Sequence, residues 1–174
     1  MLSRPRKIRS GFTLLELVVS ATMLSALAVS CMVLVGTSYN AWNRHEDDHA
    51  TRHAGHAVLR HITRHARQAT SVAAISVATD TSGALSLTDV NGDVYVWDHN
   101  AASKEVRFGL NSATEVLATG IEELAFTGIK RNGWETTTTV GQIHSVRCST
   151  KVNVTHPSST EVVTLSNQAW IRAW

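Results

Sequence analysis

The first apolar stretch of the chain is long enough for a helix that crosses a membrane. Residues 12–36 contain one charged residue, Glu16, and no proline. At about 1.5 Å per residue, a helix of this length spans roughly 37 Å, which exceeds the ~30 Å hydrocarbon core of a bilayer. Serines and alanines interrupt the leucines and valines, and small residues let neighbouring membrane helices approach closely. We therefore predict a membrane helix over residues 12–36.

A second helical pattern follows over residues 45–70. With about 100° of rotation per residue, apolar side chains recur on one face. These side chains are Ala54, Ala57, Val58, Ile62, Ala66 and Ala69, and the opposite face carries Arg52, His53, His56, Arg60, Arg64 and Arg67. The pattern predicts an amphipathic helix over 37–71 that continues the membrane helix. A bend is expected at Gly55 or Gly36, because glycine lowers helix propensity by about 1 kcal/mol relative to alanine.

The period changes to two after residue 71, which predicts strands. Two alternating runs, 85–88 and 94–97, flank an Asn-Gly pair and predict a hairpin. Residues 143–154 also alternate, which predicts an antiparallel strand whose core face is His144, Val146, Cys148, Thr150, Val152 and Val154. Further strands are expected at 72–77, 105–108, 125–129 and 161–165. The predicted fold class is α+β, with six or seven strands in an antiparallel β-sheet domain, 72–174, packed against the long helix.

Charge is distributed unevenly between the N-terminus and the rest of the chain. The formal net charge of +2 depends on Arg4, Arg6, Lys7 and Arg9, which precede the apolar run. Without these four of the 16 basic residues, 12 face 14 acidic residues. The folded part therefore has no basic excess that would favour nucleic acid as a partner. Basic residues before an apolar helix favour a cytoplasmic N-terminus.

Glu16 is the one charged residue inside the apolar run. A carboxylate in hydrocarbon costs roughly 2.5–3.5 kcal/mol on insertion scales, so such a residue normally has a partner. Cleavage of the chain before Phe12 would create an α-amino group four residues from Glu16. We expect this amine to pair with Glu16 of the same chain or of a neighbouring subunit.

The sequence GFTLLE at residues 11–16, preceded by basic residues and followed by the apolar run, resembles the class III leader of type IV pilins and type II secretion pseudopilins. The resemblance implies that residues 1–11 are a leader, which a prepilin peptidase removes by cutting after Gly11. It also implies N-methylation of Phe12 and a role for Glu16 in filament assembly. Many family members carry a proline about two-thirds along the anchor, where this chain has Val33.

The order of the downstream segments is similar to that of the larger minor pilins, such as the J-type minor pseudopilin and the W-type minor pilin. The Asn-Gly hairpin, Arg107-Phe108 and residues 116–126 carry this likeness. It implies a pilin-like fold and a structural role in filament assembly or protein transport. We expect no enzymatic activity, because the sequence has no Gly-rich phosphate loop and no distinguishable Ser/His/Asp grouping. The implied partners are other pilins or pseudopilins, met through the N-terminal helix, the prepilin peptidase and the inner membrane. The implied location is a single pass through the bacterial inner membrane, with the C-terminal domain in the periplasm or in an extracytoplasmic filament.

Two other readings of the anchor and the domain stay open. Residues 28–31, Ala-Val-Ser-Cys, are similar to a lipoprotein cleavage box, in which lipidation of Cys31 would replace the membrane helix. The apolar run continues past Cys31, however, and Ala28 stands where leucine is usual. A membrane-tethered adhesin or ligand-binding domain would instead use the five tryptophans at 42, 97, 134, 170 and 174 for contacts.

Two patterns suggest a metal site, although we expect neither to bind a metal. Histidines recur one turn apart at 45, 49, 53, 56, 61 and 65, but they fall on different faces of the helix. Asp89, Asn91 and Asp93 alternate like the start of a calcium loop, but the glycine is fourth rather than sixth and Asn100 replaces the bidentate glutamate. We expect no cofactor and no disulfide, and we expect Cys148 to be a core residue rather than a nucleophile.

Overall fold

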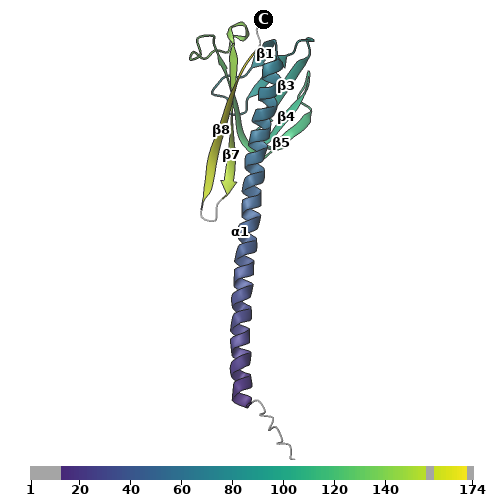
Figure 1. The fold of residues 1–174 in the computed structure, drawn as a ribbon. Helices are drawn as coiled ribbons and strands as arrows, with labels where there is room; N and C mark the ends of the chain where they lie inside the picture. The colour runs from purple at the N-terminus through teal and green to yellow at the C-terminus, as the bar shows by residue number, and fades with distance from the viewer. Residues whose placement is uncertain (1–12, 156–158, 172–174) are drawn as a thin grey trace, which may run out of the picture. The chain divides into compact units, whose positions relative to one another are not determined.

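The computed structural model describes residues 13–155 and 159–171. The predicted cleavage residues Gly11 and Phe12 lie outside these residues. The chain divides into two compact units, Met1–Asn43 and Arg44–Trp174. The elements, which Figure 1 draws, are α1 (Leu14–Gln68), β1 (Ser71–Ile75), β2 (Ala84–Thr88), β3 (Val94–Asn100), β4 (Glu105–Leu110), β5 (Glu115–Thr119), β6 (Ile121–Ile129), the 3₁₀ turn η1 (Val140–Gln142), β7 (Ser145–Thr155) and β8 (Thr160–Trp170).

The two predicted helical segments form a single helix, α1, of 55 residues. Thr13 precedes its first turn, and the hydroxyl oxygen of Thr13 accepts a hydrogen bond from the backbone N–H of Glu16 at 3.3 Å. A threonine in this position satisfies one of the otherwise unpaired N–H groups at a helix N-terminus. At the other end, Arg67 lies in the last turn, where a cation interacts favourably with the helix dipole.

The strands form two sheets rather than one. The first has the order β1-β2-β3-β4-β5 and the second the order β6-β7-β8, and all neighbouring strands are antiparallel. Eight strands in the described residues therefore replace the six or seven predicted. The change of sheet occurs at Gly120, whose φ of 78° lies in the left-handed region that favours glycine. Because β5 ends at Thr119 and β6 begins at Ile121, this one residue redirects the chain from the first sheet to the second.

A short segment before β2 connects the two sheets. The backbone N–H of Gly83 donates to the carbonyl oxygen of Leu124 at 2.8 Å, and the N–H of Leu124 donates to that of Thr81 at 2.9 Å. The buried ring of His99 in β3 adds a second link, since its Nε2 lies 2.9 Å from the carbonyl oxygen of Ile121 in β6. The two sheets are therefore joined partly by backbone hydrogen bonds and partly by the His99 imidazole.

The predicted Asn-Gly hairpin is present as β2 and β3, with Thr88 paired to Val94. Its loop is organised by Asp89, whose Oδ1 accepts the backbone N–H groups of Asn91 at 2.8 Å and Asp93 at 3.0 Å. Gly92 has a φ of 89°, as a turn glycine requires. The Asp89 carboxylate therefore stabilises the hairpin turn that was predicted in preference to a calcium-binding loop.

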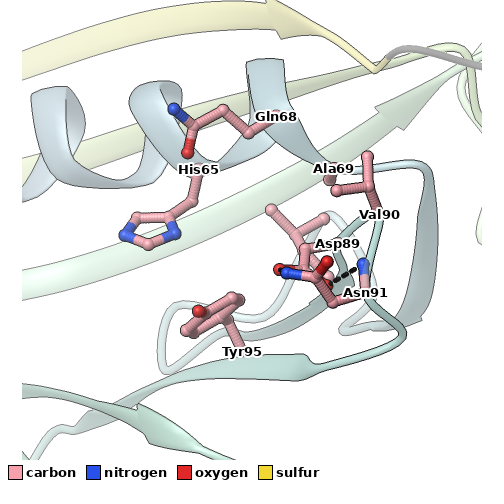
Figure 2. A pocket seen from close by; sticks show the side chains of 8 residues that line it. His65, Gln68, Ala69, Asp89, Val90, Asn91 and Tyr95 are labelled. Carbon is pink, nitrogen blue, oxygen red and sulfur yellow. Dashed lines mark hydrogen bonds between the residues drawn. The ribbon is translucent and has the colours of Figure 1, made fainter.

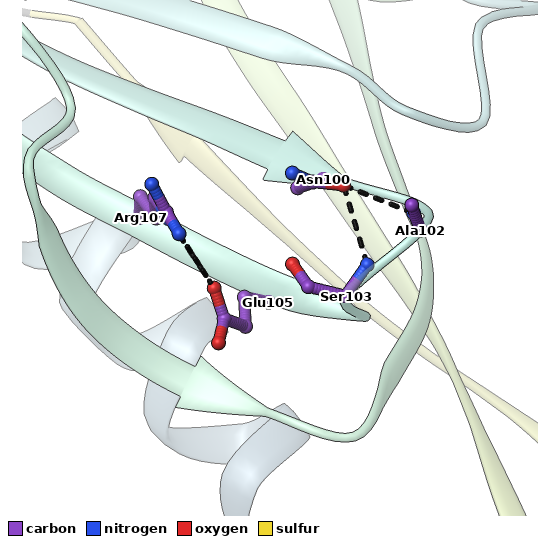
Figure 3. Close-up of polar contacts among 5 residues, drawn as sticks. All are labelled: Asn100, Ala102, Ser103, Glu105 and Arg107. Atoms are coloured by element: carbon purple, nitrogen blue, oxygen red, sulfur yellow. Dashed lines mark hydrogen bonds and ion pairs between the residues drawn. The ribbon is translucent and has the colours of Figure 1, made fainter.

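The next hairpin, between β3 and β4, is also held by a side chain. Figure 3 shows the side-chain oxygen of Asn100 accepting the backbone N–H groups of Ala102 at 3.0 Å and Ser103 at 3.3 Å. Beside it, Arg107 forms an ion pair with Glu105 at 2.9 Å within β4. Asn100, the residue that does not match a calcium-binding glutamate, thus caps a turn.

The core of the Arg44–Trp174 unit lies between the second half of α1 and both sheets (Figure 1). The buried hydrophobic residues of α1 are Val58, Leu59, Ile62 and Ala66, and the buried Ala69 follows directly after the helix. They pack in one cluster with Trp97 and Val106 from the first sheet and Phe126 and Val152 from the second. Burying each large side chain contributes about 1.5–3 kcal/mol. The predicted apolar face is confirmed, except that Ala57 is exposed and Leu59 joins the core.

Gly55 has a role other than the predicted bend. It is buried within α1, and a Cβ atom built there would lie 2.8 Å from Leu165 Cδ1, 3.3 Å from Val152 Cγ1 and 3.4 Å from the Thr150 hydroxyl. The absence of a side chain at Gly55 therefore lets α1 approach β7 and β8 closely. Gly36, the other expected bend, lies inside α1 with nothing within 4 Å of its Cβ position.

The alternation predicted for residues 143–154 is present in β7, the central strand of the second sheet. Val146, Cys148, Thr150, Val152 and Val154 are all buried. Ser145, which was predicted to face water, is buried as well. Its hydroxyl oxygen accepts a hydrogen bond from the Gln168 amide at 2.9 Å. A hydrogen bond to the neighbouring strand β8 therefore compensates for the burial of this polar residue.

Candidate membrane and assembly site

The predicted assembly residue, Glu16, lies in the first turn of α1 and is exposed. Its backbone N–H is held by Thr13, so Thr13-Leu14-Leu15-Glu16 has the residue pattern of a helix-capping box. A carboxylate in the first helical turn is also favoured by the partial positive charge of the helix N-terminus. The sequence reasoning missed the role of Thr13, although the Thr-x-x-Glu spacing signals it.

The helix surface after Glu16 is apolar on all sides and uncovered within the described structure. Leu14 is 83% exposed and Met32 79% exposed, and the large side chains between them are exposed as well. A helix that is hydrophobic all round belongs in a protein core or in a membrane. By length and composition, this part of α1 is able to cross a membrane, and none of its most apolar window is buried inside the protein.

Hydroxyl groups within the apolar run are satisfied by the helix itself. Each donates to a backbone carbonyl oxygen three or four residues earlier: Ser20 to Glu16, Thr22 to Val19, Ser25 to Thr22, Ser30 to Ala26, and Thr37 to Val33 and Leu34. In hydrocarbon, an unpaired hydroxyl would be costly. After the hydroxyl groups are satisfied, Glu16 is the polar side chain that still needs a partner in hydrocarbon, because it carries the one charge between residues 13 and 43.

Cys31 lies in the C-terminal part of this run, as an exposed free thiol within α1. Lipidation at this position stays an alternative prediction. Cys148 is also a free thiol, but it is buried in β7, and burial raises its pKa. A thiol with a raised pKa stays protonated and is a poor nucleophile. Its environment agrees with the prediction of a core residue.

Two of the helix histidines lie against aromatic rings of the first sheet. The centroid of His61 is 4.5 Å from that of Phe108, and the centroid of His65 is 4.8 Å from that of Tyr95. The indole N–H of Trp97 donates to Nδ1 of His61 at 3.2 Å, so this nitrogen carries no proton. These aromatic partners come from β3 and β4. The contact could not be predicted from the helix sequence alone, because the strands are distant in the chain.

The surroundings of these two imidazoles favour their neutral forms. Burial lowers the pKa of His61 most strongly, and the nearby charges of His65 and Arg64 lower it further. Burial is also the largest cause of the lowered pKa of His65, followed by Arg64, while Asp89 acts in the opposite direction. Within residues 13–155 and 159–171, no group of three His, Cys, Asp or Glu side chains is placed to hold a metal ion.

A pocket of about 380 Å³ lies beside His65, between the end of α1 and the β2–β3 turn (Figure 2). Gln68, Asp89, Asn91 and Tyr95 contribute polar groups to its wall. The Asp89 and Asn91 side chains point toward each other in Figure 2, since the Asn91 amide donates to Asp89 Oδ2 at 3.3 Å. Much of the hydrogen-bonding capacity of Asp89 is thus used within the turn.

The tryptophans divide between the core and the surface. Trp97 is fully buried, whereas Trp134 is 78% exposed and Trp170 is 59% exposed. Trp42 is exposed too, in the Met1–Asn43 unit, and Trp174 lies outside the described residues. Among the described residues of the Arg44–Trp174 unit, Trp134 and Trp170 are therefore the exposed indoles that are candidate contact residues.

The structure brings Glu16 together with Thr13, and His61 and His65 together with the aromatic residues of β3 and β4. It leaves the other helix histidines on the exposed face. Comparisons with protein-family models, with curated proteins and with solved structures gave no match to this chain.

Proposed function

We propose that this protein is a minor pilin-like structural subunit that assembles into a type II secretion pseudopilus or a type IV pilus. The observation that carries the proposal is the placement of GFTLLE, residues 11–16, at the start of the apolar run 12–36, whose single charged residue is Glu16. A leader, a capped helix start and an exposed apolar surface are the features that such a subunit needs. None of them requires a bound cofactor.

The proposed assembly step follows from the chemistry of Glu16. Cleavage after Gly11 creates a cationic α-amino group at Phe12. In an apolar filament core, the attraction between this amine and a carboxylate is much stronger than in water, because the effective dielectric constant is lower. An incoming subunit whose amine reaches Glu16 of its neighbour neutralises both charges. The apolar side chains of α1 then pack against the helices of neighbouring subunits.

The proposed location follows from the same segment. Before assembly, the apolar part of α1 spans the inner membrane with its basic N-terminus in the cytoplasm. The C-terminal unit then lies on the periplasmic side, where its sheets are free to contact other minor subunits or cargo.

A second candidate function is a membrane-tethered binding protein, which the exposed Trp134 and Trp170 favour. Tryptophan is enriched among residues that dominate protein interfaces. This alternative needs the anchor only as a tether. It therefore predicts normal activity for a protein whose helix cannot assemble, whereas the filament proposal predicts loss of activity.

The experiment that tests the proposal is intact-mass spectrometry of the full chain, extracted from membranes after co-expression with a prepilin peptidase. We expect a mass that begins at Phe12 and carries one added methyl group. Gly11→Val should remain uncleaved, and omission of the peptidase should have the same effect. A mass corresponding to cleavage before a lipidated Cys31 would remove the pilin-like proposal.

A further inference from the structure

Three arginines line one pocket near the C-terminal end of α1. Arg60, Arg64 and Arg67 lie at positions i, i+4 and i+7, so they share one face of the helix. They surround a pocket of about 530 Å³ with Thr63, Gln68 and Asn167. Asn167 comes from β8, so the pocket lies between the helix and the second sheet, entirely within the Arg44–Trp174 unit.

These arginines have no acidic partner among the described residues. The four described ion pairs join Lys104 to Glu122, Arg107 to Glu105, Lys130 to Glu135 and Lys151 to Glu123, and none involves α1. From residue 49 to residue 68, the helix contains arginines and histidines but no aspartate or glutamate. Asp89, whose charge raises the pKa of His65, lines the pocket beside His65 and not the arginine pocket.

This arrangement is more than an exposed basic helix face. Like charges at i, i+4 destabilise a helix, so a bound anion that neutralised Arg60 and Arg64 would remove this repulsion. The three side chains also border a hollow whose floor includes the buried Thr63. A concave site with several uncompensated guanidinium groups is suited to bind anions, because each guanidinium donates two parallel hydrogen bonds to a carboxylate or phosphate.

The spacing of the arginines favours one class of anion. Arg60 and Arg64 are separated by about 6 Å along the helix axis, and Arg60 and Arg67 by about 10.5 Å. This row is longer than a single oxyanion. In an extended peptide, side chains on one face repeat about every 6.6–6.8 Å, so two carboxylates at alternate positions match the spacing of Arg60 and Arg64. The Asn167 and Gln68 amides at the rim are able to bind the peptide backbone.

We propose that this arginine pocket docks an acidic peptide segment of a partner protein, with at least two carboxylates on alternate residues. All residues that line the pocket lie between Arg60 and Asn167, so the site includes neither Glu16 nor the leader. The proposal therefore does not rest on filament assembly, and either can fail alone.

The test is fluorescence anisotropy with the full chain in a non-ionic detergent. The probe is a labelled peptide with alternating Glu and Ser, and the matched control is the same peptide with Gln in place of Glu. We expect the Glu peptide to bind, to weaken as salt screens the charges, and to bind at least about tenfold more tightly than the Gln peptide. Equal binding of the two peptides would overturn the proposal.

Variants locate the site on the protein. Arg60→Gln, Arg64→Gln and Arg67→Gln should each weaken binding by about tenfold, because each removes a charge-assisted hydrogen-bonding group. Asn167→Asp places a carboxylate in the pocket without a change of size, and should also weaken binding. Arg52→Gln lies on the same helix outside the pocket and should have no effect. An equal loss with Arg52→Gln would show non-specific attraction and contradict the proposal.

Two further probes distinguish other anions. Inorganic phosphate should compete with the peptide only weakly, and phosphatidylglycerol added to the detergent micelles should displace the peptide no better than phosphatidylcholine does. If the Glu peptide did not bind while a labelled phosphatidylglycerol bound the wild-type chain and not the pocket variants, an anionic lipid would be the ligand and the peptide proposal would be wrong. Circular dichroism of each variant checks that the fold is retained, which the exposure of all three arginines leads us to expect.

Discussion

Gly55 and Glu16 illustrate how much of a residue's role its own sequence neighbourhood reveals. The capping pattern around Glu16 is local, so four consecutive residues contain the signal for Thr13 and the helix start, although the sequence-based prediction did not use it. Gly55 was interpreted as a bend, because glycine weakens a helix. Its actual partners are Leu165, Val152 and Thr150, which lie about 100 residues later in β7 and β8. No local pattern specifies such an approach.

Gly55→Leu should destabilise the Arg44–Trp174 unit by about 1–3 kcal/mol, because a side chain has no room between α1 and the second sheet. The urea midpoint of the full chain in detergent measures this change. Ala57→Leu is the matched control, since Ala57 is exposed two residues away on the same helix. If both variants unfolded at the wild-type midpoint, the close approach at Gly55 would not constrain the fold.

Cys148 should be unreactive in the folded protein. Its thiol is buried and its pKa is raised by burial, so little thiolate is present near neutral pH. In a Cys31→Ser chain treated with iodoacetamide at pH 8, we expect mass spectrometry to detect no modification until a denaturant is added. Rapid alkylation under native conditions would contradict the predicted burial.

At the scale of elements, the clearest patterns were predicted well. The helical periodicity, the Asn-Gly hairpin and the alternation of β7 each reflect one face buried against a core. β5 was missed because it is an edge strand of the first sheet, and its exposed Val116 gives no alternation toward a core. The separation into two sheets was missed because it depends on the conformation of Gly120.

The contact between α1 and the β3–β4 pair predicts how stability depends on pH. Folding favours neutral His61 and His65, since their pKa values in the folded state lie below the ordinary value near 6.5. Their stabilising contribution is fully present above the unfolded pKa. It falls as the pH drops below about 6.5 toward the lower pKa of the folded state, because the unfolded chain binds more protons.

We therefore expect the urea midpoint to fall between pH 7.5 and pH 5. His65→Phe should reduce this fall, because phenylalanine keeps the ring contact with Tyr95 without a titrating group. His53→Phe changes an exposed histidine of the same helix and should leave the pH dependence as in the wild type. A midpoint independent of pH in the wild-type protein would contradict the predicted role of the two imidazoles.

At the scale of the whole molecule, the chain contains a core-bearing unit and a unit that exposes apolar surface. The buried core residues all lie within Arg44–Trp174, and the exposed apolar helix surface lies within Met1–Asn43. The Arg44–Trp174 unit has the buried core that an independent domain needs. The apolar helix surface of the Met1–Asn43 unit favours a membrane or a protein core as its environment.

A truncated protein of residues 44–174 should fold and remain soluble without the apolar helix. Neither chelator nor reductant should change its melting temperature, because its one cysteine, Cys148, is a free thiol and no metal-binding group occurs in the described residues. Differential scanning calorimetry with and without each reagent measures this. A lower melting temperature with chelator would indicate a metal site after all.

The assembly role of Glu16 is the central claim, and recovery of the protein in filaments tests it most directly. Wild-type chain, Glu16→Leu and Glu16→Asp should be expressed with a prepilin peptidase and a pilin-type assembly system. Sheared filaments and processed protein are then quantified in parallel. We predict normal cleavage for all three proteins, strong loss of Glu16→Leu from filaments, and an intermediate loss for Glu16→Asp, whose shorter side chain keeps the charge. Recovery of processed Glu16→Leu at the wild-type level would contradict the account.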